Sequence, residues 1–166
     1  MGAPQNHLWT TAHDTGNRCR LDDMDDDISS ELDRLTVCSQ RDLQRMWELL
    51  MQPLGFRSTS LWVTFIGSDD RPTRFLIEVA ESAQVPDPRE VANLYDVLQQ
   101  VIDEDPDDLS VAFLITRPGR DGTRPFDREL SARLVAGSRS AGVAIRPIHV
   151  ADDVAVRAIT PDDLAA

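Results

Sequence analysis

The feature that most constrains the fold of this chain is the run SVAFLIT at residues 110–116. It is almost wholly apolar, and it lies between the acidic segment DEDPDD and the loop RPGRDGTR. A strand with one solvated face alternates apolar and polar residues, whereas a strand covered on both faces does not alternate. The run therefore predicts a central strand of a sheet that is covered on both sides.

Helix signals lie on either side of this strand. Upstream, residues 87–90 (Asp-Pro-Arg-Glu) supply an N-cap, a first-turn proline and a reciprocal acid, and apolar residues then repeat at helical spacing as far as DEDPDD. Downstream, Thr123 or Arg124 can cap a helix that has Pro125 in its first turn and ends at Gly142. We expect one long helix before this strand in the sequence and one long helix after it.

The remaining elements follow from the same signals. Residues 39–42 (Ser-Gln-Arg-Asp) open a helix with a capping pair, and the runs 61–66 and 74–79 predict a β-hairpin. The apolar runs 143–150 and 154–159 predict two closing strands. The resulting order is αββαβαββ, which is typical of an α/β fold, a three-layer-type sandwich with a mixed sheet.

Composition divides the 166 residues into three parts. Residues 22–34, DDMDDDISSELDR, hold seven acids and one arginine, and the chain is poor in apolar residues before about residue 36. Such a segment buries too little surface to offset the entropy of ordering it. We therefore expect a disordered acidic arm over 1–35, a single α/β domain over 36–160 and a short C-terminal tail over 161–166.

Charge and cysteine content exclude several classes of protein. The formal net charge is −12, from 29 acids and 17 bases, and an excess of this sign disfavours binding to nucleic acid or to an anionic membrane. No apolar run is long enough to cross a bilayer, and no signal peptide is evident. Two cysteines at no metal or redox spacing favour reduced thiols, so we expect a cytoplasmic protein.

The loop after the apolar run is the strongest candidate for a site. Residues 117–146 hold seven arginines against three acids, and several of these arginines lie beside a helix N-terminus, where the helix dipole also attracts anions. The candidate anion- or partner-binding residues are Arg117, Arg120, Arg124 and Arg128. The alternative is that these arginines are solvated or pair with Asp121, Asp127 and Glu129. Neither glycine-rich nucleotide motif fits the loop.

The arrangement of these elements resembles a known family. A hairpin, a helix, a strand, a proline-glycine loop, a helix and a strand pair over residues 60–160 are similar to the core of RadC and other JAB/MPN-type domains. In that family the strand ends in His-x-His, the next helix begins with Ser-x-x-Asp, and a glutamate on an early strand activates zinc-bound water. In this chain the histidine positions hold Ile115 and Arg117, ahead of Pro118 and Gly119.

The other metal-site positions also depart from the family pattern. The Ser-x-x-Asp position falls near PFDRE at 125–129, which has no serine, and Asp127 or Glu129 stands near the former ligand. The candidate acid on the early strands is Glu78, and His149 is the only histidine of the folded region. A zinc site needs three protein ligands, and we expect His149 to be solvent-facing or hydrogen-bonded. The resemblance thus implies a member with no metal and no cofactor.

We therefore expect a non-catalytic protein-interaction or anion-binding domain of a bacterial protein. The acidic arm is a candidate to cover the arginine loop until a partner displaces it. Alternatives are a divergent hydrolase that uses Asp127 or Glu129 with a water, a cysteine chemistry at Cys38, or a nucleic-acid-associated protein that uses the arginine loop, with Phe126 as its one nearby aromatic residue.

The C-terminus suggests one further partner. The ending Leu164-Ala165-Ala166 resembles the tail by which ClpXP-type bacterial proteases recognise tagged proteins. A frayed, alanine-rich end is the alternative interpretation.

Overall fold

A computed structural model describes residues 18–20, 26–81, 84–105 and 107–165. Its strands are β1 (Arg18–Arg20), β2 (Ser60–Ile66), β3 (Pro72–Glu81), β4 (Ser110–Thr116), β5 (His149–Ala151) and β6 (Val156–Ala158). Its helices are α1 (Asp26–Arg34), α2 (Gln40–Leu50), α3 (Pro88–Glu104), α4 (Pro125–Ala141) and α5 (Pro161–Ala165). Among the helices of this described part, none has the length and apolar character needed to cross a membrane.

The strands form one sheet in the order β1-β3-β2-β4-β5-β6. β4 and β5 run parallel, and all other neighbouring pairs run antiparallel. The predicted hairpin is present as β2 and β3, and β4 lies between β2 and β5 with Val63 opposite Phe113. The fold is an α/β sandwich with a mixed sheet, as the sequence predicted.

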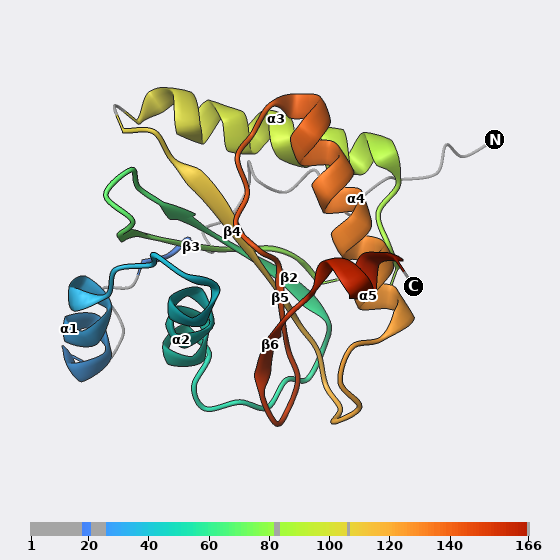
Figure 1. Ribbon diagram of the computed structural model, residues 1–166, viewed down its shortest axis with the longest axis horizontal. Coiled ribbons are helices and arrows are strands. Elements are labelled where there is room, and N and C mark those ends of the chain that lie inside the picture. Colours follow the sequence, from blue (N-terminus) through green and yellow to red (C-terminus); the bar gives the residue numbers. More distant parts are fainter. Residues whose placement is uncertain (1–17, 21–25, 82–83, 106, 166) are drawn as a thin grey trace.

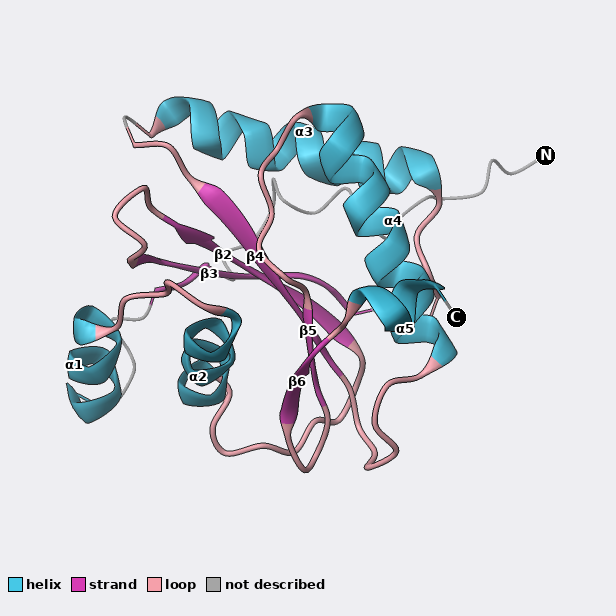
Figure 2. Ribbon diagram, viewed as in Figure 1, coloured by secondary structure: helices cyan, strands magenta, loops and turns pink. Residues whose placement is uncertain are grey.

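Helices cover both faces of this sheet, as Figure 1 and Figure 2 show. α3 and α4 cover one face over a core that includes Val111, Phe113 and Ile115 of β4. α1 and α2 cover the other face over a second core that includes Ala112 and Leu114. Successive residues of β4 therefore enter opposite cores, which explains why its sequence has no polar alternation.

The helix ends form as their capping residues predict. Ser39 Oγ accepts a hydrogen bond from the amide of Asp42, and the Asp42 carboxylate accepts one from the Ser39 amide, so α2 begins with a capping box. Asp87 caps α3 in the same way with Glu90. α4 ends at Gly142, whose φ of 70° is the left-handed conformation that glycine adopts without strain.

α3 and α4 approach each other closely at Gly137. A Cβ atom on Gly137 would lie 2.6 Å from Tyr95 Cε2 and 2.6 Å from Val91 Cγ1. Beside this contact, the buried Tyr95 hydroxyl donates a hydrogen bond of 2.6 Å to the carbonyl oxygen of Leu134. The absence of a side chain at Gly137 thus allows the two helices to pack and the tyrosine to bond across them.

The segment before β5 is less regular than its sequence predicted. Of the predicted strand 143–150, only the last two residues lie in β5 (His149–Ala151). The segment before β5 still lies beside β4, because Val111 N donates to Ala144 O and Arg146 N donates to Val111 O. Pro147 has no amide hydrogen, so it cannot donate to a ladder at this point. The 154–159 strand is likewise reduced to β6 (Val156–Ala158).

The N-terminal arm differs from the predicted disordered segment. α1 is a helix whose Leu32 is 5% exposed in the core above α2, and Glu31 accepts a hydrogen bond of 2.8 Å from Arg45. Asp33 binds Arg74 at 3.1 Å. The apolar Leu32 makes this part of the arm able to fold, and Glu31 and Asp33 lie against α2 and β3 rather than over the arginine loop.

The rest of the arm is described only at residues 18–20, which pair antiparallel with β3. Residues 1–17 and 21–25, on which the predicted disorder also falls, lie outside the described residues. At the other end of the chain, most of the predicted tail is the short helix α5.

Candidate functional site

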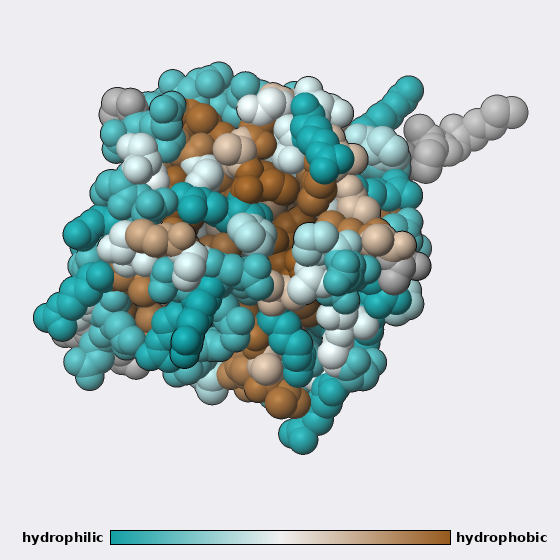
Figure 3. Space-filling view, viewed as in Figure 1, coloured by the Kyte–Doolittle hydropathy of each residue, from teal (hydrophilic) through white to brown (hydrophobic). Residues whose placement is uncertain are grey.

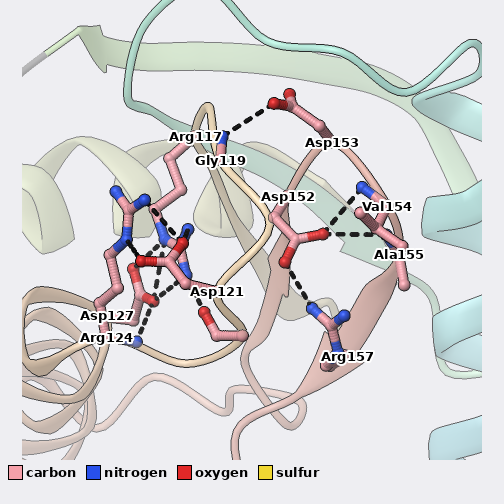
Figure 4. Close-up of polar contacts among 11 residues, drawn as sticks. Arg117, Gly119, Asp121, Arg124, Asp127, Asp152, Asp153, Val154, Ala155 and Arg157 are labelled. Atoms are coloured by element: carbon pink, nitrogen blue, oxygen red, sulfur yellow. Dashed lines mark hydrogen bonds and ion pairs between the residues drawn. The ribbon is translucent and has the colours of Figure 1, made fainter.

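The arginine loop, residues 117–124, connects the carboxyl end of β4 to α4 (Figure 4). Gly119 and Gly122 have φ values of 113° and 68°, which are costly for residues with a side chain. At Gly119 a Cβ atom would also lie 2.4 Å from Nη2 of Arg124. The two glycines let the loop turn back, so that Arg117 meets Asp127 on the first turn of α4.

Arg117 is buried and fully engaged within the protein. Its side chain is 1% exposed and that of Asp127 is 0% exposed. Nε donates to both carboxylate oxygens of Asp127 at 3.0 Å, and Nη2 donates to Oδ2 at 2.9 Å. Nη1 contacts Asp121 Oδ1 at 3.4 Å, and Nη2 also bonds the carbonyl oxygen of Gly122. The expectation that Arg117 receives an external anion is therefore wrong, because its donors face internal acceptors.

Arg124 is also paired, although it is more exposed. Its Nε and Nη2 each donate to Asp121 at 2.7 Å, a bidentate geometry. The hydrogen bonds from Arg124 lower the pKa of Asp121 to about 2, so this carboxylate is charged at neutral pH. The backbone amide of Arg124 also donates to Asp127 Oδ2 at 2.7 Å. The alternative interpretation, that arginines pair with Asp121 and Asp127, is thus confirmed for Arg117 and Arg124.

The other two candidate arginines have different surroundings. Arg120 is exposed at the tip of the loop, and Arg128 is half-buried on α4, where its charge helps to lower the pKa of Asp163 at α5. Glu129, the third predicted acceptor, pairs with Arg133 at 3.2 Å. The structure therefore does not bring the four candidate arginines together in one anion site.

Two adjacent aspartates, Asp152 and Asp153, lie in the turn between β5 and β6, at the same end of the sheet as the arginine loop (Figure 4). Asp152 is 0% exposed; its Oδ1 accepts from the amides of Val154 and Ala155 at 2.9 and 3.0 Å, and its Oδ2 accepts from Arg157 at 2.7 Å. Burial acts to raise the pKa of Asp152, but the bond from Arg157 and the two amides outweigh burial and lower it. Asp152 thus holds the turn in one shape.

Asp153 joins three loops. Its Oδ1 accepts from the amide of Phe56 at 3.0 Å, and its Oδ2 accepts from the amide of Gly119 at 2.8 Å. The Asp153 amide donates in turn to the carbonyl oxygen of Gly119 at 2.9 Å. The amides of Phe56 and Gly119 lower the pKa of Asp153, so it remains a charged acceptor at neutral pH.

Sequence reasoning missed both aspartates. Adjacent aspartates in a short turn signal local bonds such as those of Asp152. Nothing in the sequence indicates the contact from Asp153 to Phe56, which is 97 positions away.

The residues that could complete a metal site do not meet. Asp127 lies on the first turn of α4, whereas Glu78 on β3 is opposite Trp62, which packs on the α2 face of the sheet. His149 also faces the α2 side and is 0% exposed, so the solvent-facing alternative is wrong. Its Nδ1 bonds the carbonyl oxygen of Pro147 at 2.9 Å, and burial lowers its pKa. Within the described ranges, no cluster of three or more His, Cys, Asp or Glu side chains is placed to hold a metal ion.

The remaining chemical candidates have ordinary surroundings. Cys38 is exposed, with Sγ 3.9 Å from Oδ2 of Asp70. Phe126 packs against the core under α3 and α4, so its ring is not displayed beside the arginine loop. Neither residue adds a reactive or stacking group to the loop.

No protein-family model matches this chain, and no curated protein sequence is similar to it.

Proposed function

We propose that this protein is a non-catalytic protein-interaction domain of the metal-free JAB/MPN-like type. The observation that carries the proposal is the buried pair between Arg117 and Asp127, in which two bonds of 3.0 Å and one of 2.9 Å join the side chains. The resemblance implies that a hydrolase of this type would hold its metal at the position of this pair.

The guanidinium group of Arg117 supplies the positive charge that a bound metal ion would otherwise supply to the Asp127 carboxylate. Arg117 occupies the second histidine position of the resemblance, and Asp127 stands near the third ligand position. An arginine has five donors and no lone pair to give to a metal, so it cannot replace an imidazole ligand. Its positive charge instead neutralises the buried aspartate, so neither charge is left unpaired in the core.

The order of elements is compatible with the proposal. The hairpin β2–β3, α3, β4, the proline-glycine loop, α4 and the strand pair β5–β6 follow each other as the resemblance requires. Glu78 and Asp127 lie on opposite faces of the sheet, which separates the two acids that the hydrolytic reaction would use together.

A hydrolase that uses Asp127 or Glu129 has less support from the same contacts. Asp127 is 0% exposed, and its oxygens accept bonds from Arg117 and from the Arg124 amide, so neither oxygen is available to activate a water. Glu129 is exposed and paired with Arg133 on the surface of α4.

The test is a measurement of metal content and of hydrolytic activity on the full chain. We expect purified protein to carry no stoichiometric metal, added zinc to leave its Tm unchanged, and generic ester, peptide and phosphate substrates to remain intact. A ligand that binds the native state raises its stability by mass action, so a zinc site would be visible as a Tm increase. Stoichiometric metal, or turnover that disappears in Asp127→Asn, would refute the proposal.

A further inference from the structure

Three loops meet at one end of the sheet and are locked together by Asp153. These are the α2–β2 connection through Phe56, the arginine loop through Gly119, and the β5–β6 turn itself. The hydrogen bonds of 3.0 and 2.8 Å and the returning bond of 2.9 Å fix the loops relative to one another. This loop end is therefore a preorganised surface, whose ordering is achieved before any partner binds.

Each of the three loops displays one exposed side chain directly beside this junction. Arg57 follows Phe56, Arg120 follows Gly119, and Val154 follows Asp153. All three are exposed, and Arg120 lies close enough to Asp153 to help lower the pKa of that carboxylate. The junction thus places two guanidinium groups and one apolar side chain at the same end of the molecule.

The acids at this end already have partners. Asp127 binds Arg117, Asp121 binds Arg124, Asp152 binds Arg157, and Asp153 binds two backbone amides. Arg57 and Arg120, by contrast, form no hydrogen bond or ion pair with any residue that the structure describes. The loop end therefore presents two cations that no internal carboxylate neutralises through direct contact.

Val154 supplies an apolar contact point at the same loop end. It is 51% exposed, and only one other large hydrophobic side chain among the described residues, Phe75 on β3, is comparably open. Figure 3 shows a hydrophobic area at the lower end of the molecule, where Figure 1 places the β5–β6 turn. In the adjoining connection Leu54 and Phe56 are half-buried. An exposed apolar residue beside arginines is a composition that protein interfaces favour.

We propose that the loop end formed by Arg57, Arg120 and Val154 binds an acidic segment of a protein partner. In this arrangement the partner's carboxylates pair with the two guanidinium groups, and an apolar side chain of the same segment packs on Val154. The inference rests on the proposed function, because it names the surface and the partner chemistry of a binding domain.

The chemistry of the surface favours a peptide over other anions. A free phosphate would use the arginines but leave Val154 exposed to water, so the apolar contact would contribute nothing to its binding. A nucleic acid would use the two guanidinium groups, but among the described residues these three loops display no exposed aromatic side chain for stacking. An acidic segment with an apolar residue uses all three side chains at once.

The test is a nuclear magnetic resonance titration of the full chain with synthetic peptides. One peptide carries a leucine between pairs of glutamates, a second carries serine in place of the leucine, and inorganic phosphate is the third probe. We expect amide shifts at Arg57, Arg120 and Val154, tighter binding of the leucine peptide than of the serine peptide, and weaker binding at higher salt.

Matched variants locate the binding surface. The double variant Arg57→Ala with Arg120→Ala should weaken binding of the leucine peptide about tenfold, which corresponds to about 1.4 kcal/mol. The control is Arg89→Ala with Arg139→Ala, which removes the same charge from exposed positions on α3 and α4 and should leave binding unchanged. Both double variants replace exposed side chains, and an unchanged amide spectrum shows that each is folded.

The possible failures are distinguishable. Peptide binding that is mapped elsewhere, or that survives the Arg57/Arg120 double variant, would overturn this surface and leave the proposed binding function standing. Equal binding of all three probes would show a simple anion site and overturn the peptide inference. Absence of binding by the leucine peptide would overturn it as well. Association of the chain with itself through the same amides, seen by sedimentation without peptide, would identify a second copy as the partner instead. Metal or turnover, measured separately, bears only on the proposed function.

Discussion

Substituting either member of the buried pair tests whether Arg117 and Asp127 depend on each other. Arg117→Met leaves a carboxylate that is 0% exposed with only the Arg124 amide as donor, and Asp127→Asn leaves a guanidinium that is 1% exposed beside a neutral amide. Breaking a buried ion pair by removing one partner costs about 3–5 kcal/mol. Because the total stability of a domain is about 5–15 kcal/mol, each variant should be folded but clearly weakened.

The two substitutions should also be strongly non-additive. Once one charge is gone, removing the second relieves the unpaired partner, so the double variant should recover about 1–3 kcal/mol of the summed loss. Urea unfolding followed by the fluorescence of the buried Trp47 gives the free energies, and each single loss corresponds to a Tm decrease of roughly 6–20 °C.

A separate surface pair on α4 provides the control for this cycle. Arg133→Met and Glu129→Gln remove an ion pair whose side chains are 35% and 57% exposed, so they should cost far less. Losses below about 1 kcal/mol for Arg117→Met or Asp127→Asn, or simple additivity of the two, would refute the view that the pair acts as one buried unit.

Two other changes have definite expected outcomes. Burial raises the pKa of Tyr95, the chain's only tyrosine, so above about pH 10 the unfolded state ionises first and the free energy of unfolding falls as pH rises. Tyr95→Phe should remove that dependence and cost about 1 kcal/mol at neutral pH through loss of the bond to Leu134, with tyrosinate absorbance confirming the pKa direction. Gly137→Ala should destabilise the protein by about 1–3 kcal/mol in urea, although alanine favours helices, because its Cβ meets Tyr95; a stabilised variant would contradict this packing.

Local signals predicted most of the fold, because capping, turns and apolar periodicity act over a few residues. Ser39 with Asp42 and Asp87 with Glu90 begin helices as their spacing indicates, and the apolar run 110–116 is the strand that both cores share. The predicted strand 143–150 was too long because an apolar composition does not guarantee a hydrogen-bonded ladder, and Pro147 interrupts it.

The site was harder to predict, because it depends on contacts between distant residues. Arginine is mostly exposed in proteins, so the complete burial of Arg117 required the knowledge that Asp127 would face it across a folded loop. The role of Asp153 depends on Phe56 and Gly119, which are 97 and 34 positions away in the sequence. Charge counting found the arginines, but it could not tell which of them were already neutralised.

The packing of α1 also limits how the chain can be shortened. A version beginning at Thr36 would lose Leu32 and leave an open apolar seam over α2, where Ile28 and Leu35 also pack. We expect that shortened protein to aggregate at high concentration, whereas a protein that begins at Asp26 keeps this apolar surface covered by α1.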